Sequence, residues 1–245
     1  RLFSAFQKLF ARLPGSLYMA VISTGTIFAA ATGIVGSSVN LLCVMAEPTM
    51  RKGGYDIRMG AGSIAASGTL GILIPPSIML VILGPIVGVP VTDLFISAVI
   101  PGLLLASLYI GYSLIKCAIW PKYGPPLPPE LRPHSLAEVL KELFVGAIPL
   151  LVLIFSVLGS IMFGIASPTE ASACGAFAAI VMVMAYGKFS LKALAKALYS
   201  TAKMSAMILI MIASCNFFGA VFSRLGGATF ISNQLLSIHL SPMVM

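Results

Sequence analysis

Two short segments of the chain combine hydroxyl groups with residues that interrupt a helix. The first is Gly36-Ser37-Ser38, in the middle of an apolar stretch, and the second is GILIPPS over 71–77. Proline lacks an N–H and disfavours helical geometry in the residue before it. Backbone groups at such breaks lose their helical partners. Freed amides at helix N-termini attract an anion, and freed carbonyls together with hydroxyls suit a cation such as Na⁺.

The composition around these segments is that of a membrane protein. The chain has 245 residues, of which 59% are hydrophobic and 9% charged, whereas soluble domains carry about 25% charged residues. The apolar runs are continuous and do not alternate with period two, which excludes a β-barrel. The net charge of +8 comes from basic residues that punctuate the apolar runs, so it indicates membrane topology and not a nucleic-acid partner. We therefore predict an all-α polytopic membrane protein.

The spacing of the basic clusters predicts how often the chain crosses the membrane. If each cluster is cytoplasmic, residues 59–115 and 142–187 each cross twice, and 204–223 cross once. Residues 16–48 are too short for two crossings. We expect them to form a re-entrant hairpin that turns at Gly36-Ser37-Ser38.

The chain divides into five predicted segments. They are an amphipathic interfacial helix over 1–14, a re-entrant hairpin over 15–50, a broken helix and the following transmembrane helix over 55–120, a Pro-rich cytoplasmic linker over 121–134, and a second bundle of transmembrane helices over 135–245. Within the second bundle, residues 135–145 have the pattern of another surface helix. We expect the chain to be an internal piece of a longer protein, with the second bundle truncated at its C-terminus.

The proline pair predicts a helix broken into halves over 57–70 and 76–88. Extended backbone between them must be buried in protein or line a cavity. The N-termini after Ser38 and near Pro76 would meet at mid-membrane and favour a carboxylate, while helix C-termini with the serine hydroxyls would hold Na⁺. The predicted substrate and ion site comprises Gly36, Ser37, Ser38, Gly71, Ile74, Pro75, Pro76 and Ser77, with Ser37 and Ser38 as the Na⁺ ligands. The alternative is a kinked helix with serines bonded to their own backbone.

One acidic motif has a structural explanation. Ser167, Pro168 and Glu170 fit a helix N-cap, the first helical position and the third, which is a capping box. A proton or ion role for Glu170 is the alternative, because acids at membrane depth are costly. His134 and His239 are isolated. No nucleophile–base or paired-acid constellation sits at a shared depth, so we predict neither an enzyme nor a cofactor.

At these motifs the sequence resembles the large membrane subunit of tripartite ATP-independent periplasmic (TRAP) transporters, the DctM-like family. The matching features are Gly36-Ser37-Ser38, Pro48, Gly54-Tyr55, GTLGILIPPSIMLVILG over 68–84, LFISAVIPGLLLA over 94–106 and SPTEASA over 167–173. The resemblance implies an inverted-repeat, elevator-type secondary transporter, each repeat carrying a hairpin and a broken helix. This chain would hold one of the two half-sites.

The resemblance also implies a function. The family imports organic anions, often C4-dicarboxylates, driven by a Na⁺ gradient and not by ATP. Its partners would be a periplasmic substrate-binding protein and a small four-helix membrane subunit, in the bacterial inner membrane. Two alternatives remain open at this point: a stand-alone tricarboxylate or divalent-anion carrier, and a membrane scaffold that does not transport.

Overall fold

The computed structural model describes residues 2–126 and 136–237, and these ranges contain helices and turns but no β-strand. They divide into two compact units, Arg1–Val183 and Met184–Met245. In chain order the helices are α1 (Leu2–Leu9), α2 (Ser16–Thr32), α3 (Val35–Lys52), α4 (Ile57–Leu73), α5 (Ile78–Val87), α6 (Val91–Ile119), the 3₁₀ turn η1 (Pro121–Tyr123), α7 (Leu136–Ile154), the π-helical turn η3 (Phe155–Gly159), α8 (Ser160–Met162), α9 (Pro168–Ala185), α10 (Leu191–Arg224) and α11 (Gly227–Ser237).

Several of these helices are long and apolar enough to cross a membrane. In the described part of the chain four qualify singly: Val91–Ile119, Val139–Met162, Pro168–Ala185 and Leu191–Arg224. A fifth span is formed if the bent pair α4 and α5 is counted as one. Five spans agree with the five crossings predicted from the basic clusters. The protein is therefore an all-α, multi-pass membrane protein.

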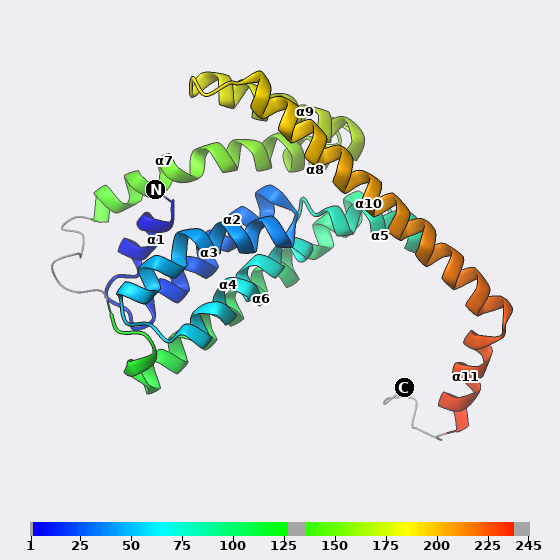
Figure 1. Cartoon of the computed structure of the whole chain (residues 1–245), viewed down its shortest axis with the longest axis horizontal. Helices are drawn as coiled ribbons and strands as arrows, with labels where there is room; N and C mark the ends of the chain where they lie inside the picture. Colours follow the sequence, from blue (N-terminus) through cyan, green and yellow to red (C-terminus); the bar gives the residue numbers. More distant parts are fainter. Residues whose placement is uncertain (1, 127–135, 238–245) are drawn as a thin grey trace. The chain divides into compact units, whose positions relative to one another are not determined.

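The hairpin turn lies three residues before its predicted position. α2 ends at Thr32 and α3 begins at Val35, so the chain reverses at Gly33 and Ile34 (Figure 1). Gly33 has φ +61°, a left-handed conformation that costs other residues about 1–2 kcal/mol. The prediction of a tip at Gly36-Ser37-Ser38 was wrong because serine is tolerated in the first turn of a helix. Those three residues are the first turn of α3.

The helix break is shorter than predicted. α4 continues to Leu73, the break covers only 74–77, and α5 begins at Ile78 with the two axes bent by 44°. Pro75 disfavours helical backbone angles in the residue before it. Ile74 accordingly has extended backbone at φ −82°, ψ 120°. Gly71 was predicted to lie in extended backbone; instead it lies within α4 because glycine alone does not end a helix. Ser77 occupies the N-cap position of α5, and Gly88, which has φ +70°, occupies its C-cap position.

The segment 135–145 was predicted as a separate surface helix, but it is the beginning of α7. α7 runs unbroken from Leu136 to Ile154 and packs against α1 and α2. The Nζ atom of Lys8 lies 2.6 Å from a carboxylate oxygen of Glu142. A Cβ atom at Gly146 would lie 3.1 Å from the backbone nitrogen of Leu2. Helices on both sides of the predicted linker thus belong to one packed unit; residues 127–135 of that linker lie outside the described residues.

The apolar face of α1 packs on protein. Leu2, Phe3 and Ala5 are buried, and Phe3 joins a core cluster with residues of α2, α3 and α4. Residues 1–14 were predicted to form one amphipathic interfacial helix, but α1 covers only Leu2–Leu9 and turns follow it. In this structure the apolar face of α1 packs against α2 and α7.

The loops around the base of the hairpin are held by tyrosine hydroxyls. Tyr55 donates to the carbonyl of Pro125 at 2.7 Å, and Tyr18 donates to the carbonyl of Tyr123 at 2.7 Å. Burial raises the pKa of Tyr55, so its phenol stays protonated and remains a donor. These bonds anchor the chain after α6 against the start of α2 and of α4, which fixes the base of the hairpin.

Candidate functional site

The hairpin turn lies directly against the helix break. A Cβ atom added at Gly33 would lie 3.0 Å from the carbonyl oxygen of Pro76 and 3.5 Å from the amide nitrogen of Ile78. Only glycine combines the positive φ with this approach. The hairpin turn therefore meets the break in the 71–77 segment through Gly33, a residue outside both segments singled out from the sequence.

Small residues let the helices around this junction approach closely. A Cβ atom at Gly68 of α4 would lie 2.2 Å from Cγ2 of Val39 and 3.1 Å from its backbone nitrogen, near the start of α3. On α2, a Cβ atom at Gly25 would lie 2.6 Å from the Cβ of Ser67. Close backbone approach through small residues is the usual packing device of membrane helices. α2, α3 and α4 lie side by side for this reason (Figure 1).

The break itself is closed by α6 and by one serine. The side chain of Ile74 packs against Gly102 of α6. A Cβ atom added at Gly102 would lie 2.9 Å from Cγ1 of Ile74. The hydroxyl of Ser77 donates to the carbonyl oxygen of Ile72 at 2.6 Å. Ser77 is 1% exposed and makes no cap bond to α5. Its hydroxyl therefore gives a hydrogen-bond donor to a carbonyl at the end of α4, where helical donors run out.

A partly buried pair of hydroxyl groups spans the hairpin turn. The Oγ1 atom of Thr32 donates to the carbonyl of Phe28 at 2.9 Å and lies 2.7 Å from the Oγ of Ser38. Because the single proton of Thr32 is used on Phe28, Ser38 is the donor of the second bond. Ser38 is fully buried. Its lone pairs and those of Thr32 are the side-chain acceptors at this turn.

The two predicted Na⁺ ligands have different surroundings. Ser37 is exposed, and its hydroxyl bonds to the carbonyl of Ile34 at 3.3 Å, as expected from a serine bonding to its own helix. Neighbouring residues on a helix point about 100° apart. Ser38 points into the protein and Ser37 does not.

The other predicted residues separate into two groups. Ile74, Pro75 and Ser77 are buried at the break, and Pro76 touches the hairpin turn. Gly71 is buried within α4, one turn before the break, and Gly36 is exposed in the first turn of α3. The residues missed by the sequence analysis are Thr32, Gly33 and Gly68. A glycine directly after an apolar helix is a stop signal, and this signal could have placed the turn at Gly33.

The arrangement brings two helix N-termini together without any charged side chain. α3 begins at Val35 and α5 begins at Ile78, on either side of the contact between Gly33 and the break. Residues 32–38 and 74–78 contain no acid or base. The polarity available is that of helix amides, helix carbonyls and hydroxyls. Such ends attract anions at N-termini and coordinate cations at C-termini.

The capping box before α9 has its own hydrogen bonds. The backbone N–H and the hydroxyl of Ser167 donate to Oε2 of Glu170 at 2.8 and 2.7 Å, and the N–H of Glu170 points back to the Ser167 hydroxyl at 3.4 Å. Pro168 is the first residue of α9. Glu170 is exposed, and its described hydrogen bonds all join it to Ser167. They are the bonds of a helix cap.

Comparison with known proteins places the chain in a family. A family model described as "Tripartite ATP-independent periplasmic transporter, DctM component" matches residues 1–245. The C4-dicarboxylate TRAP transporter large permease protein DctM of Pseudomonas aeruginosa is 32% identical over 229 residues, which are 93% of this chain and 52% of that protein. The protein of the same name from Rhodobacter capsulatus is 31% identical over 245 residues, 93% of this chain and 53% of that protein.

A relative named for another substrate matches as well. The sialic acid TRAP transporter permease protein SiaT of Haemophilus influenzae is 28% identical over 247 residues, 99% of this chain and 38% of that protein. The chain spans about half the length of the DctM relatives. These relatives are transporter permease subunits and not enzymes. Together with its hydrophobic helices, the match over its whole length shows that this chain belongs to the DctM component family of TRAP transporters.

Proposed function

We propose that this chain is part of the membrane permease subunit of a Na⁺-driven, binding-protein-dependent importer of organic acids such as C4-dicarboxylates, in a bacterial inner membrane. The observation that carries the proposal is the contact between the Gly33 turn and the Pro76–Ile78 break. Two interrupted helices meeting inside a helical bundle form the binding geometry of secondary transporters. A periplasmic substrate-binding protein and a small four-helix membrane subunit complete the proposed importer.

The substrate is an organic anion because the site offers amides at two helix N-termini. Relatives of this chain are named for C4-dicarboxylate, sialic acid and isethionate. Those names describe the relatives, and the three named substrates have an acidic group in common. For this chain we place the acidic group of the substrate at the N-termini of α3 and α5. A C4-dicarboxylate is the substrate class to test first.

The coupling ion belongs near Ser38 in this proposal. The buried Ser38 and the half-buried Thr32 form a hydroxyl pair beside the end of α2, where the last turn of a helix leaves carbonyls without helical donors. Oxygen atoms of this kind are the ligands that hard cations prefer. Ser37, although predicted with Ser38, faces away.

The test uses the full-length permease complex in proteoliposomes with its binding protein. Succinate uptake should require an inward Na⁺ gradient. Ser38→Ala should raise the Na⁺ concentration for half-maximal uptake on the order of tenfold, the effect of losing about 1.4 kcal/mol of binding. Ser37→Ala is the matched neighbour and should change it less. Unchanged Na⁺ dependence in a Ser37→Ala/Ser38→Ala double variant would contradict the ion-site assignment.

Two other outcomes would identify the alternatives. Full-rate uptake without the binding protein would favour a stand-alone anion carrier. If the folded, unmutated complex neither took up nor bound substrate, a membrane scaffold would be favoured.

A further inference from the structure

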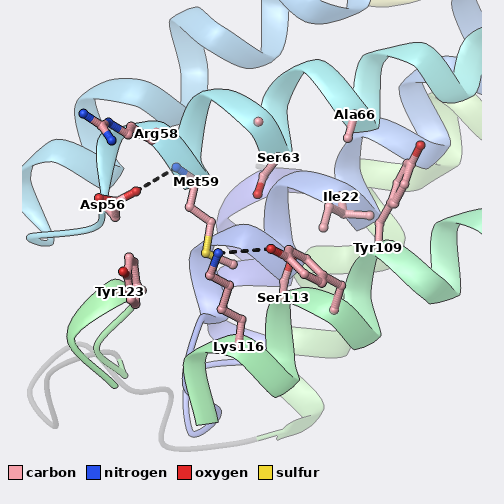
Figure 2. A pocket seen from close by; sticks show the side chains of 12 residues that line it. Ile22, Asp56, Arg58, Met59, Ser63, Ala66, Tyr109, Ser113, Lys116 and Tyr123 are labelled. Carbon is pink, nitrogen blue, oxygen red and sulfur yellow. Dashed lines mark hydrogen bonds between the residues drawn. The ribbon is translucent and has the colours of Figure 1, made fainter. Parts of the chain in front are cut away.

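A cavity of about 730 Å³ lies between the start of α4 and the end of α6, away from the hairpin junction. α2 contributes Ile22 to its inner wall, and the loop after α6 contributes Tyr123 (Figure 2). Gly62 on α4 also lines it, and a Cβ atom at Gly62 would meet nothing within 4 Å. Nothing in the transport proposal uses this cavity.

Lys116 brings a positive charge to this cavity. Figure 2 shows its side chain extending from α6 toward Met59 on α4. The Nζ atom donates to the hydroxyl of Tyr112 at 3.0 Å and lies 5.4 Å from the ring centres of both Tyr112 and Tyr123. Among the described residues no carboxylate forms an ion pair with it. Its charge is held by aromatic rings and is available to an anion.

The other charged groups of the cavity leave it net positive. Asp56 lies in the wall, but its Oδ1 accepts from the backbone N–H of Met59 at 2.8 Å and caps α4. Arg58 lies at the mouth with its guanidinium pointing outward, as Figure 2 shows, and forms no ion pair in the described part of the chain. Two cations against one carboxylate leave one positive charge. A ligand with a single negative charge balances the cavity.

The surroundings of the cavity indicate where the rest of such a ligand lies. Tyr112 is 59% exposed, and along the same side of α6 Leu108 and Ile115 are also 59% exposed. Trp120, the only tryptophan of the chain, follows directly after α6 and is 50% exposed. Tyrosine and tryptophan gather at the boundary between lipid and water, and basic residues collect there on the cytoplasmic side. The positively charged cavity therefore adjoins an apolar helix surface.

We propose that this cavity binds the headgroup phosphate of an anionic phospholipid, with Lys116 as the primary partner and the acyl chains along α6. Basic pockets between membrane helices are known to take anionic headgroups. Arg58 contributes from the mouth, and the tyrosine hydroxyls can donate to phosphate or glycerol oxygens. The lipid would join α4 to α6, so binding should stabilise the permease. This proposal goes beyond the transport function and does not depend on it.

The test measures lipid binding to the full-length permease complex in detergent. Native mass spectrometry with added phosphatidylglycerol should show tighter binding than with phosphatidylcholine. The double variant Arg58→Gln/Lys116→Gln should bind phosphatidylglycerol on the order of tenfold more weakly, or weaker still. Each basic residue near an anionic lipid contributes about 1 kcal/mol of binding free energy. Arg51→Gln is the matched control, because Arg51 belongs to the same basic end of the molecule, pairs with Glu47 and does not line the cavity. It should leave the affinity within about twofold, which is the range of a surface change.

A variant that only fills the cavity separates the effect of cavity volume on lipid binding from the effect of charge. Gly62→Leu should fill part of the cavity without removing any charge, and it should also weaken phosphatidylglycerol binding while the complex keeps its gel-filtration profile. Equal binding of both lipids by the unmutated complex, or binding unaffected by Arg58→Gln/Lys116→Gln, would overturn the proposal. Displacement of phosphatidylglycerol by succinate at concentrations that support uptake would also overturn it, and would identify the cavity as a station for the soluble anion.

Discussion

Two turns of the first unit each reverse the chain through a glycine with positive φ, but they are stabilised in opposite ways. The turn after α8 has Gly164 at φ +68° with nothing within 4 Å of an added Cβ. Its own backbone closes it: the N–H of Ile165 donates to the carbonyl of Ser160 and that of Gly164 to Ile161, both at 3.0 Å. This is a Schellman motif, and the capping box of Ser167 follows it.

The described residues of the turn after α2 show no such backbone closure, and the local bond across it is the one between the hydroxyls of Thr32 and Ser38. Ile34, at the N-cap position of α3, has extended backbone and makes no side-chain cap bond. What surrounds the turn is the break at Pro76, Ser77 and Ile78. A turn that depends on a second irregular segment changes when that segment moves, whereas a self-capped turn does not. The two turns should therefore respond differently to movement of the break.

The largest expected difference between the turns comes from replacing their glycines. Gly33→Ala and Gly164→Ala both force alanine into left-handed geometry, at about 1–2 kcal/mol. Only Gly33→Ala also displaces a neighbour, the Pro76 carbonyl at 3.0 Å. We expect succinate uptake to fall on the order of tenfold or more for Gly33→Ala, as for small misplacements at a reacting or binding site, and by less than about twofold for Gly164→Ala. Equal losses in the two variants would show that strain alone, and not the contact, matters.

A smaller effect is expected from the serine that closes the break. Ser77→Ala leaves the carbonyl of Ile72 without its 2.6 Å donor, and the loss of one hydrogen bond costs about 0.5–1.5 kcal/mol. The unfolding temperature of the complex in detergent should fall. Ser107→Ala is the control, because Ser107 is an exposed serine that bonds back to Leu103 within α6. If Ser77→Ala were as stable as Ser107→Ala, the break would not need its hydroxyl.

The smallest effect is expected at the self-capped turn, and it tests the role of Glu170. Glutamine can serve in a capping box as glutamate does, so Glu170→Gln should keep both stability and uptake. Glu170→Ala should cost about 0.5–1 kcal/mol of stability, as cap deletions do, with uptake unchanged. Loss of uptake in Glu170→Gln at normal stability would assign Glu170 to ion or proton transport, the alternative left open by its position.

Much of the architecture followed from local signals. The number of crossings was predictable because each apolar run must bury about 20 residues in lipid and basic residues stay on one side. The broken helix was predictable from Pro75 and Pro76, since a missing N–H acts on the residues next to it. The cap at Ser167 was predictable because all its partners lie within four residues. The break and the cap are decided within one or two turns of chain, and each crossing within one apolar run.

The position of the hairpin turn needed more than the hydroxyls of Ser37 and Ser38. Those residues suggested a tip because serine bonds to nearby backbone, yet Gly33 is the residue at the turn. The signal was present as a glycine after an apolar helix, but it competed with Gly36, and composition alone does not rank two glycines. Contact with the Pro76 carbonyl distinguishes them, and that contact joins residues 43 positions apart.

The sequence by itself determined that this protein is a polytopic helical membrane protein with one hairpin and one broken helix, because hydropathy, charge and proline act locally. Only the tertiary structure decided which atoms meet. It placed Gly33 against the break, turned Ser38 inward and Ser37 outward, and opened a cavity beside Lys116. The reason is physical: these features depend on how closely α2, α3, α4 and α6 approach, and that approach is set by small residues such as Gly25 and Gly68 acting across helices.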